Sequence, residues 1–222
     1  MNNLILISFL GEGSTDYRFF SNIVQRLVGE LLLEQGKGDI IQWQPIYKHG
    51  ASAQESIYNA SVQARFSSTL ILHSDTDNNS RAQTIANKFQ LGLNQINGCS
   101  DDEVCKNITL AIPVTETEAW MLADKELLKS EINTTLSNQA LALTYQQNRI
   151  ESIRDPKQKI NDAINIFHQS LPRKRRRYAV SIDDLYESVS QNIKFDKLDS
   201  IASYKKFKED LIVALRNKNI LD

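Results

Sequence analysis

Four short strand-like runs, separated by helical patterns, constrain the fold of this chain most strongly. Three of them, at 4–9, 69–72 and 108–112, are rich in Ile, Leu or Val and are too short for a helix. The fourth, at 43–47, contains Pro45, which suits an edge strand better than a central one. Strands that alternate with helices favour a parallel sheet. We therefore expect an α/β fold with a Rossmann-like parallel sheet flanked by helices.

Apolar residues at helical spacing separate these runs and continue alone after residue 133. This change of pattern predicts an α/β domain over 1–130 and a C-terminal all-helical extension over 131–222. The extension is near the lower size range of independent domains. The expected helices cover 16–33, 51–66, 80–93, 116–128, 139–147, 157–170, 182–192 and 202–216.

Composition narrows the class of protein further. The chain has 222 residues, of which 41% are hydrophobic and 24% charged, as in an ordinary globular protein with a sizeable core. Its formal charge of −1 argues against binding nucleic acid through bulk electrostatics. No apolar run approaches the roughly 20 residues that cross a bilayer, and no basic leader precedes the first strand. We expect a cytoplasmic protein without membrane contact, in which Cys99 and Cys105 are free thiols rather than a loop disulfide.

Acidic residues follow three of the four strand-like runs. Glu12 lies between two glycines after the first, Asp75 and Asp77 follow the third, and Glu116 and Glu118 follow the fourth. Residues at the carboxyl ends of parallel strands lie in the crevice where open α/β sheets bind their ligands. Carboxylates gathered there are suitable ligands for a hard divalent cation. Asp75 and Asp77 are the strongest candidates, Glu12 is expected to act as ligand or base, and Glu118 is preferred slightly over Glu116.

Each acidic motif also has a structural explanation. Asp-x-Asp is common in turns, and Glu12 could point to water from a tight strand-to-helix turn. Either Glu116 or Glu118, at a helix N-terminus, would stabilise the helix dipole by about 0.3–1 kcal/mol. Two glutamates two residues apart do not share a helix face unless the first turn is irregular. The recurrence of acids after several strands is what favours a common site.

Basic residues suggest contacts with phosphate. The run at 173–177 reads Arg-Lys-Arg-Arg-Arg, and guanidinium groups bind phosphate oxygens through a rigid fork of donors. A solvated loop between helices explains the run equally well. We expect Lys157, Arg173, Arg175 and Arg176 to contact nucleic acid.

The ordered motifs resemble a known family. GEGSTD at 11–16, Asp-Thr-Asp at 75–77 and Glu-Ala-Trp at 118–120 are similar to the acidic motifs of TOPRIM domains. The likeness covers about residues 1–125 and is greatest to small TOPRIM-type proteins of bacterial anti-phage systems, related to the nuclease part of overcoming-lysogenization-defect proteins. His73-Ser74 before the Asp pair, and the lack of a glycine after Asp77, depart from that pattern.

The resemblance implies a catalytic and metal-binding set of Glu12, Asp75 and Asp77, with one or two Mg²⁺ or Mn²⁺ ions and with Glu116 or Glu118 at a second ion. It implies a nuclease that cleaves DNA or RNA. It also implies a toxin-like role in anti-phage defence, with an ATPase as partner and possible homo-oligomers.

Three alternatives stay open. A nucleotide-sugar transferase also uses Asp-x-Asp to hold a metal ion, but it leaves the Glu12 motif unexplained. A non-catalytic TOPRIM-like subunit would bind an ATPase through its helical tail. An α/β interaction protein would use all three acidic turns only as helix caps.

Overall fold

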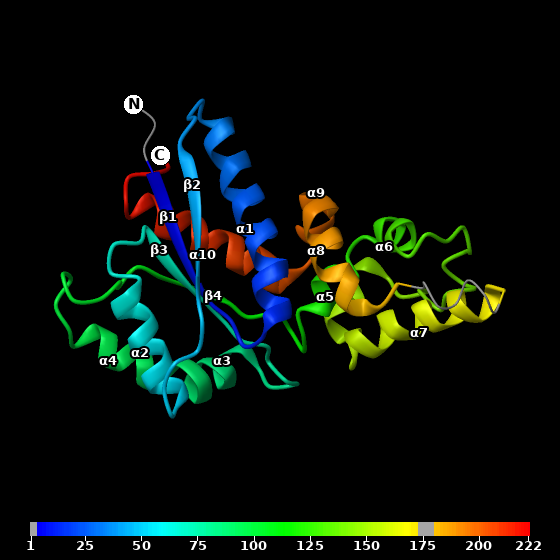
Figure 1. Ribbon diagram of the computed structural model, residues 1–222, viewed down its shortest axis with the longest axis horizontal. Helices are drawn as coiled ribbons and strands as arrows, with labels where there is room; N and C mark the ends of the chain where they lie inside the picture. The colour runs from blue at the N-terminus through cyan, green and yellow to red at the C-terminus, as the bar shows by residue number, and fades with distance from the viewer. Residues whose placement is uncertain (1–3, 173–179) are drawn as a thin grey trace.

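A four-stranded, all-parallel sheet is packed between helices in the computed structural model, which describes residues 4–172 and 180–222 (Figure 1). The strands are β1 (Leu4–Leu10), β2 (Ile40–Ile46), β3 (Thr69–His73) and β4 (Ile108–Ala111), in the order β2-β1-β3-β4. All three neighbouring pairs are parallel. The predicted α/β class and parallel sheet are therefore confirmed.

Strand β2 begins at Ile40, three residues before the predicted run, and it pairs only with β1 among the described strands. Pro45 lies opposite Phe9 in this pairing. The predicted edge position is confirmed, because a proline lacks the N–H that a second neighbouring strand would need.

Helices cover both faces of the sheet. Helices α1 (Ser14–Glu34) and α10 (Ala202–Arg216) contribute to one hydrophobic cluster with β1 residues such as Ile5 and Ile7. Helices α2 (Ala53–Gln63) and α4 (Gln90–Asn97) bury a second cluster with Leu70 and Leu72 of β3. Alternate strand residues face opposite sides, which is why one sheet supplies both clusters. The packing leaves the carboxyl ends of β1, β3 and β4 to converge at one edge.

The helix predicted over 80–93 is present but divided. It consists of α3 (Arg81–Thr84), a π-helical turn η1 (Ile85–Phe89) and α4, which continues to Asn97. Single π-turns inside helices occur frequently at functional sites. Lys88 belongs to this turn.

The single helix predicted over 116–128 is wrong. The chain forms α5 (Glu118–Met121) and α6 (Lys125–Glu131), separated at Asp124. The Asp124 side chain accepts a hydrogen bond from Leu127 N and so caps α6. Apolar spacing alone predicted one continuous helix, but Asp124 favours a helix cap and therefore separates two helices.

The helix predicted over 139–147 is also wrong. Leu141 and Leu143 are buried in the core, and Ala142 between them has a φ of 57°. The chain turns here, since Leu143 N donates to Asn138 O, and its next regular element is the 3₁₀ helix η2 (Gln147–Ser152). Apolar residues two apart here mark turns and extended chain, not a helix face.

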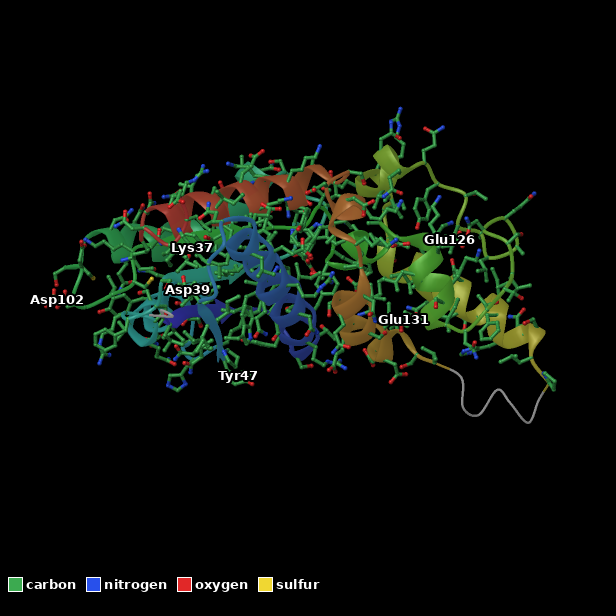
Figure 2. The ribbon with its side chains drawn as sticks, turned by 90° about the horizontal axis from the view of Figure 1, so that it is seen from above. Lys37, Asp39, Tyr47, Asp102, Glu126 and Glu131 are labelled. Atoms are coloured by element: carbon green, nitrogen blue, oxygen red, sulfur yellow. The ribbon has the colours of Figure 1, made fainter. Side chains whose placement is uncertain are left out.

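The remaining helices lie to one side of the sheet (Figures 1 and 2). They are α7 (Pro156–Ser170), α8 (Ile182–Asn192) and α9 (Phe195–Leu198). Helix α10 then returns along β4, and the cluster on its face of the sheet continues into α7 and α8. The division at residue 130 stays a prediction.

Cys99 and Cys105 are free thiols, as predicted. None of the helices in the described residues combines the length and apolar character needed to cross a bilayer.

Candidate metal centre

Glu12 lies in the turn between β1 and α1. A Cβ at Gly11 would come within 2.7 Å of the Phe9 ring, so the close packing of this turn requires glycine. Asp16 Oδ2 accepts hydrogen bonds from the backbone N–H groups of Glu12 and Gly13, at 2.9 and 2.8 Å. These bonds fix the backbone that carries Glu12 at the carboxyl end of β1.

Asp75 and Asp77 lie in the turn after β3, which is joined to the turn after β4. Thr76 Oγ1 accepts from Thr115 N at 2.7 Å, and Asp77 N donates to Thr115 O at 3.2 Å. Asp77, Asn78 and Thr115 have φ values of 49°, 67° and 65°. Asp and Asn tolerate this left-handed region, so the tight turn forms without the glycine of the resembled family. The paired turns bring the second and third acidic motifs together.

Glu116 and Glu118 approach the same place from the start of α5. Glu118 is the first residue of α5 and is 5% exposed; its Oε1 accepts a hydrogen bond from the Tyr186 hydroxyl of α8. Glu116 lies in the preceding turn and accepts from Lys157 N at 3.3 Å. Because α5 begins at Glu118, Glu116 is not part of the helix. The two glutamates therefore need not share a helix face to reach one cleft.

The acidic side chains line a single cleft of about 310 Å³ at the carboxyl edge of the sheet. The cleft includes every carboxylate predicted for the site. Its lining residues are Glu12, Gly13, Thr15, Asp16, Asp75, Asp77, Glu116, Glu118, Lys157 and Tyr186.

A positive charge already lies between the first two motifs. Lys88 Nζ is 2.7 Å from Asp77 Oδ2 and 3.4 Å from Glu12 Oε1. It also donates to Ser74 Oγ at 2.7 Å and to the backbone oxygen of Asp75 at 3.0 Å. Oxygens from both strand ends are therefore close enough to share one cation. Burial alone would lower the pKa of Lys88, but the hydrogen bond to Asp77 and the charge of Glu12 raise it.

His73 lies beneath the cleft, fully enclosed at the end of β3. Its Nδ1 is 3.0 Å from Ala111 O, and its Nε2 is 3.4 Å from Asp16 Oδ1 and 3.8 Å from Asp75 Oδ1. Burial would lower the pKa of His73, but the hydrogen bond to Asp16 raises it above its usual value. The histidine that departs from the resembled family thus connects the first acidic turn to the second.

Asp75 is the most strongly perturbed carboxyl group in the cleft. Burial raises its pKa to about 7, and the charges of Asp16, Glu118 and Glu12 add to this, while His73 opposes it. Burial and the charge of Glu118 also raise the pKa of Glu116. Like charges held together at low solvent exposure favour the entry of a proton or a cation.

The donor set fits a hard divalent ion. The cleft offers carboxylate oxygens from three strand ends, and oxygens are the ligands that Mg²⁺ prefers. Across 4–172 and 180–222, however, no three His, Cys, Asp or Glu side chains are arranged around one point as a metal site requires. Lys88 separates Glu12 from Asp77, and Asp75 accepts from Thr117 Oγ1 at 3.2 Å. Side-chain rotation and displacement of Lys88 would therefore accompany ion binding.

The predicted phosphate contacts have different outcomes. Lys157 lines the cleft, with its Nζ 3.8 Å from Glu118 Oε1. Arg173, Arg175 and Arg176 lie outside the described residues, so their role stays a prediction.

Asp16, Lys88 and Tyr186 are among the residues of the centre that sequence reasoning missed. Asp16 was part of the first motif, and an acid at the third position of a helix is a recognisable capping signal. Lys88 and Tyr186 gave no comparable signal, because each reaches the cleft from a helix distant in sequence.

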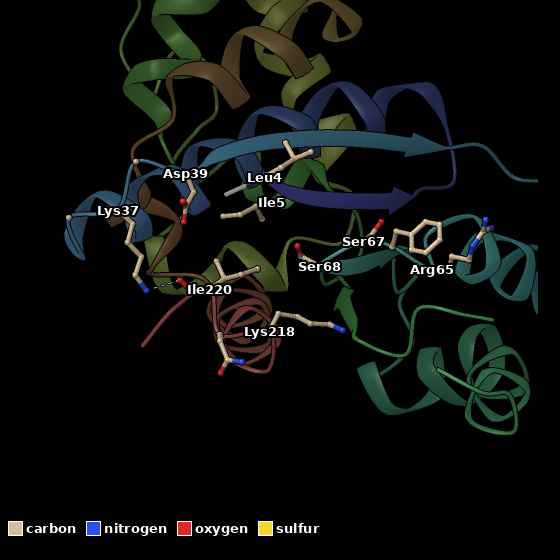
Figure 3. Close-up of a pocket in the computed structure, with 13 residues that line it drawn as sticks. Leu4, Ile5, Lys37, Asp39, Arg65, Ser67, Ser68, Lys218 and Ile220 are labelled. Carbon is tan, nitrogen blue, oxygen red and sulfur yellow. Dashed lines mark hydrogen bonds between the residues drawn. The ribbon is translucent and has the colours of Figure 1, made fainter. Parts of the chain in front are cut away.

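A larger cavity of about 660 Å³ lies at the opposite, amino-terminal edge of the sheet (Figure 3). Leu4, Arg65 and Lys218 line it, and Lys37 Nζ at its rim donates to Ile220 O at 2.9 Å. None of the predicted acidic site residues reaches it, so size alone does not identify the functional site.

Comparisons with protein-family models, curated proteins and solved structures found no match to this chain.

Proposed function

We propose that this chain is a metal-dependent hydrolase of phosphodiester bonds in nucleic acid, with one or two Mg²⁺ or Mn²⁺ ions in the acidic cleft. One observation supports this most: Glu12 and Asp77, from different strand ends, contact the same cationic group, Lys88 Nζ. Asp75, Glu116 and Glu118 line the same cleft. If the acidic residues served only as helix caps, as in an α/β interaction protein, two of them would not need to contact the same cation.

The residues of the cleft have separable roles in this proposal. A divalent ion there would neutralise phosphate charge and lower the pKa of an attacking water. Glu12 accepts the proton of that water, or holds the ion, from a turn fixed by Asp16. Lys157 and Lys88 contact phosphate oxygens and stabilise charge that develops on them. Tyr186 orients Glu118, and Thr117 orients Asp75.

The resemblance to TOPRIM domains belongs to the same proposal, together with an anti-phage role, an ATPase partner, homo-oligomers and a cytoplasmic location. Two alternatives are less well supported. A DxD-type transferase gives Glu12 no role, although Glu12 shares the cleft with the Asp pair. A non-catalytic, partner-binding subunit has no need for a half-buried carboxylate such as Asp75, which neighbouring carboxylates repel.

A cleavage panel tests the proposal. The full chain is incubated with single-stranded and double-stranded DNA and RNA in Mg²⁺, Mn²⁺ or EDTA, alone and with a neighbouring ATPase if one is encoded nearby. We expect cleavage in at least one divalent ion and none in EDTA. Cleavage that persists in EDTA, or no cleavage of any substrate in either ion, would contradict the assignment.

Replacing Lys88 is expected to strengthen binding of divalent ions. Lys88→Met removes the charge that competes for Glu12 and Asp77 but keeps the length of the side chain. Charge-assisted hydrogen bonds contribute about 1.5–3 kcal/mol, less when solvent screens them, so we expect Mn²⁺ to bind about threefold to tenfold more tightly. Isothermal titration calorimetry measures the affinity.

The matched control for this variant is Lys206→Met. Lys206 is also ion-paired, with Asp210 at 2.7 Å, but it lies outside the cleft. Its affinity for Mn²⁺ is expected to equal that of the wild type. Weaker Mn²⁺ binding in Lys88→Met would show that Lys88 does not compete with the ion.

A further inference from the structure

A second cavity adjoins the acidic cleft at the carboxyl edge of the sheet. Its volume is about 290 Å³, near the lower end of the range for small-molecule pockets. It lies where α2 and η1 approach the ends of β1 and β3, and Leu10, Ile57, Leu72 and Phe89 form its apolar walls. Of the residues that line it, only Glu12 and Lys88 have a role in the proposed hydrolysis.

The position of this cavity is the one where open α/β sheets bind ligands. In the order β2-β1-β3-β4, the chain leaves β1 toward β2 on one side and returns to β3 on the other. Helix α1 belongs to one hydrophobic cluster and α2 to the other, so the helices change face between β1 and β3. The crevice outside such a switch point is the usual ligand site of this architecture.

The two cavities share a wall. Glu12 lines both of them, and Ser74 and Lys88 line the second cavity while bonding to groups of the first. Ser74 Oγ donates to Glu12 Oε1 at 2.9 Å, and Lys88 Nζ pairs with Asp77 at 2.7 Å. A ligand that filled both cavities would place a charged group on one side of this wall and an apolar body on the other.

The rim of the second cavity is held in place by local bonds. Gly50 has a φ of +146°, and a Cβ there would come within 3.1 Å of Ser56 N. Ala51 N donates to Glu55 Oε2 at 2.8 Å, and Asn59 Nδ2 donates to His49 O at 2.9 Å. The loop therefore lies against the start of α2, and it brings the cationic Lys48 to the rim of the cavity.

We propose that this cavity, the base pocket, receives the nucleobase of the nucleotide whose phosphate lies in the acidic cleft. A nucleobase is flat and largely apolar on its faces, which suits the four apolar walls, and Lys48 and Lys88 line the cavity where they would attract its phosphate. Apolar walls read shape rather than base edges, so we expect little discrimination among bases. The inference rests on the proposed function, since it takes the cleft as the site of the phosphate.

A binding experiment tests the pocket. Ala53 is exposed, is the first residue of α2 and lines the pocket, so Ala53→Leu fills the entrance without disturbing the core. The matched control is Ala202→Leu, because Ala202 is likewise exposed and is the first residue of α10. The probes are AMP, adenosine and, as competitor, a DNA tetranucleotide, measured by calorimetry in Mg²⁺ and in EDTA, with thermal unfolding of each variant.

We expect AMP to bind the wild type and Ala202→Leu equally, and Ala53→Leu at least tenfold more weakly with an unchanged unfolding temperature. Lys48→Gln is expected to weaken AMP but not adenosine. The tetranucleotide is expected to compete with AMP. If the wild type binds no AMP, if Ala53→Leu binds it normally, or if the tetranucleotide does not compete, the assignment is overturned.

The result separates this inference from the nuclease proposal. AMP and adenosine have no internucleotide phosphodiester bond, so their binding is measured without cleavage. If the protein binds AMP but cleaves nothing, the base pocket is supported and the hydrolase function is contradicted. If it cleaves nucleic acid but does not bind AMP, the hydrolase function is supported and the base pocket is contradicted.

Discussion

Glu12→Gln is expected to lower the rate of metal-dependent cleavage by about a thousandfold, within the range of about 10²–10⁴ that a general base contributes. Glutamine has the same shape and can still accept the hydrogen bond from Ser74 Oγ. It has no negative charge, so it neither takes a proton from water nor attracts an ion shared with Asp77. The turn around it keeps its bonds to Asp16, because these involve only the backbone of Glu12 and Gly13.

The matched control is Glu126→Gln. Glu126 lies on α6 and pairs with Lys129 at 2.9 Å, among the helices beside the sheet and outside the acidic cleft (Figure 2). Rates are measured on the substrate that the panel identifies, with circular dichroism to confirm folding. If Glu12→Gln cleaves within threefold of the control, Glu12 is not part of the chemistry.

The sheet was predictable because its signals are local. Strands β1, β3 and β4 are short apolar runs that end in turn or acidic residues, and the edge position of β2 followed from Pro45. The helix boundaries were less predictable where polar side chains bond to the backbone. Asp124 capped α6 inside a predicted helix, and the turn at Ala142 replaced another.

The carboxylates of the candidate site were predictable for the same reason: each lies in the turn or at the helix start that comes after a strand, and parallel strands bring their ends together. Lys88 and Tyr186 were not, since a side chain that arrives from a remote helix depends on how that helix packs. His73 was noticed only as a departure from the resembled family. Its role follows from the packed distances to Asp16 and Asp75, which no spacing in the sequence reveals.

Lys88 and His73 affect the balance of charge in the acidic cleft. The acidic residues alone would repel one another, and two basic side chains offset this: the ammonium of Lys88 on the open side and the imidazole of His73 beneath, whose pKa the hydrogen bond to Asp16 raises. Burial still raises the pKa of Asp75, although the His73 imidazole lies 3.8 Å from it. Residues that destabilise a fold and are kept in a cleft are candidates for function.

Asp75→Asn is therefore expected to stabilise the protein in the absence of metal. The pKa of Asp75 is raised to about 7 from an ordinary value of 3.8, so its ionised form is disfavoured in the folded state. At pH 8 we expect the variant to gain about 2 kcal/mol, roughly half of what such a shift implies, because part of the carboxyl reaches solvent. For a chain of this size this raises the unfolding temperature by about 4–8 °C.

The gain depends on pH in a defined direction. Below about pH 3 Asp75 is mostly protonated in both states, so wild type and variant have similar stability; the difference grows as the pH rises toward 7 and is complete above it. Asparagine is neutral throughout, and its oxygen can still accept from Thr117 Oγ1. The carboxylates of Asp16, Glu118 and Glu12 that surround Asp75, and the imidazole of His73, are common to both proteins.

Divalent ions are expected to stabilise the wild type more than Asp75→Asn, which is the reverse of the order expected without metal. An ion that binds only the folded state stabilises it in proportion to the logarithm of its concentration over Kd, so Mn²⁺ raises the unfolding temperature of the wild type. Asp75→Asn lacks one of the proposed ion ligands, so Mn²⁺ raises its unfolding temperature less. The control Asp162→Asn removes an exposed carboxylate of α7 and is expected to follow the wild type in both respects. An Asp75→Asn protein that is no more stable than wild type in EDTA at pH 8, or that Mn²⁺ stabilises equally, would show that Asp75 is held in place by the fold and not for an ion.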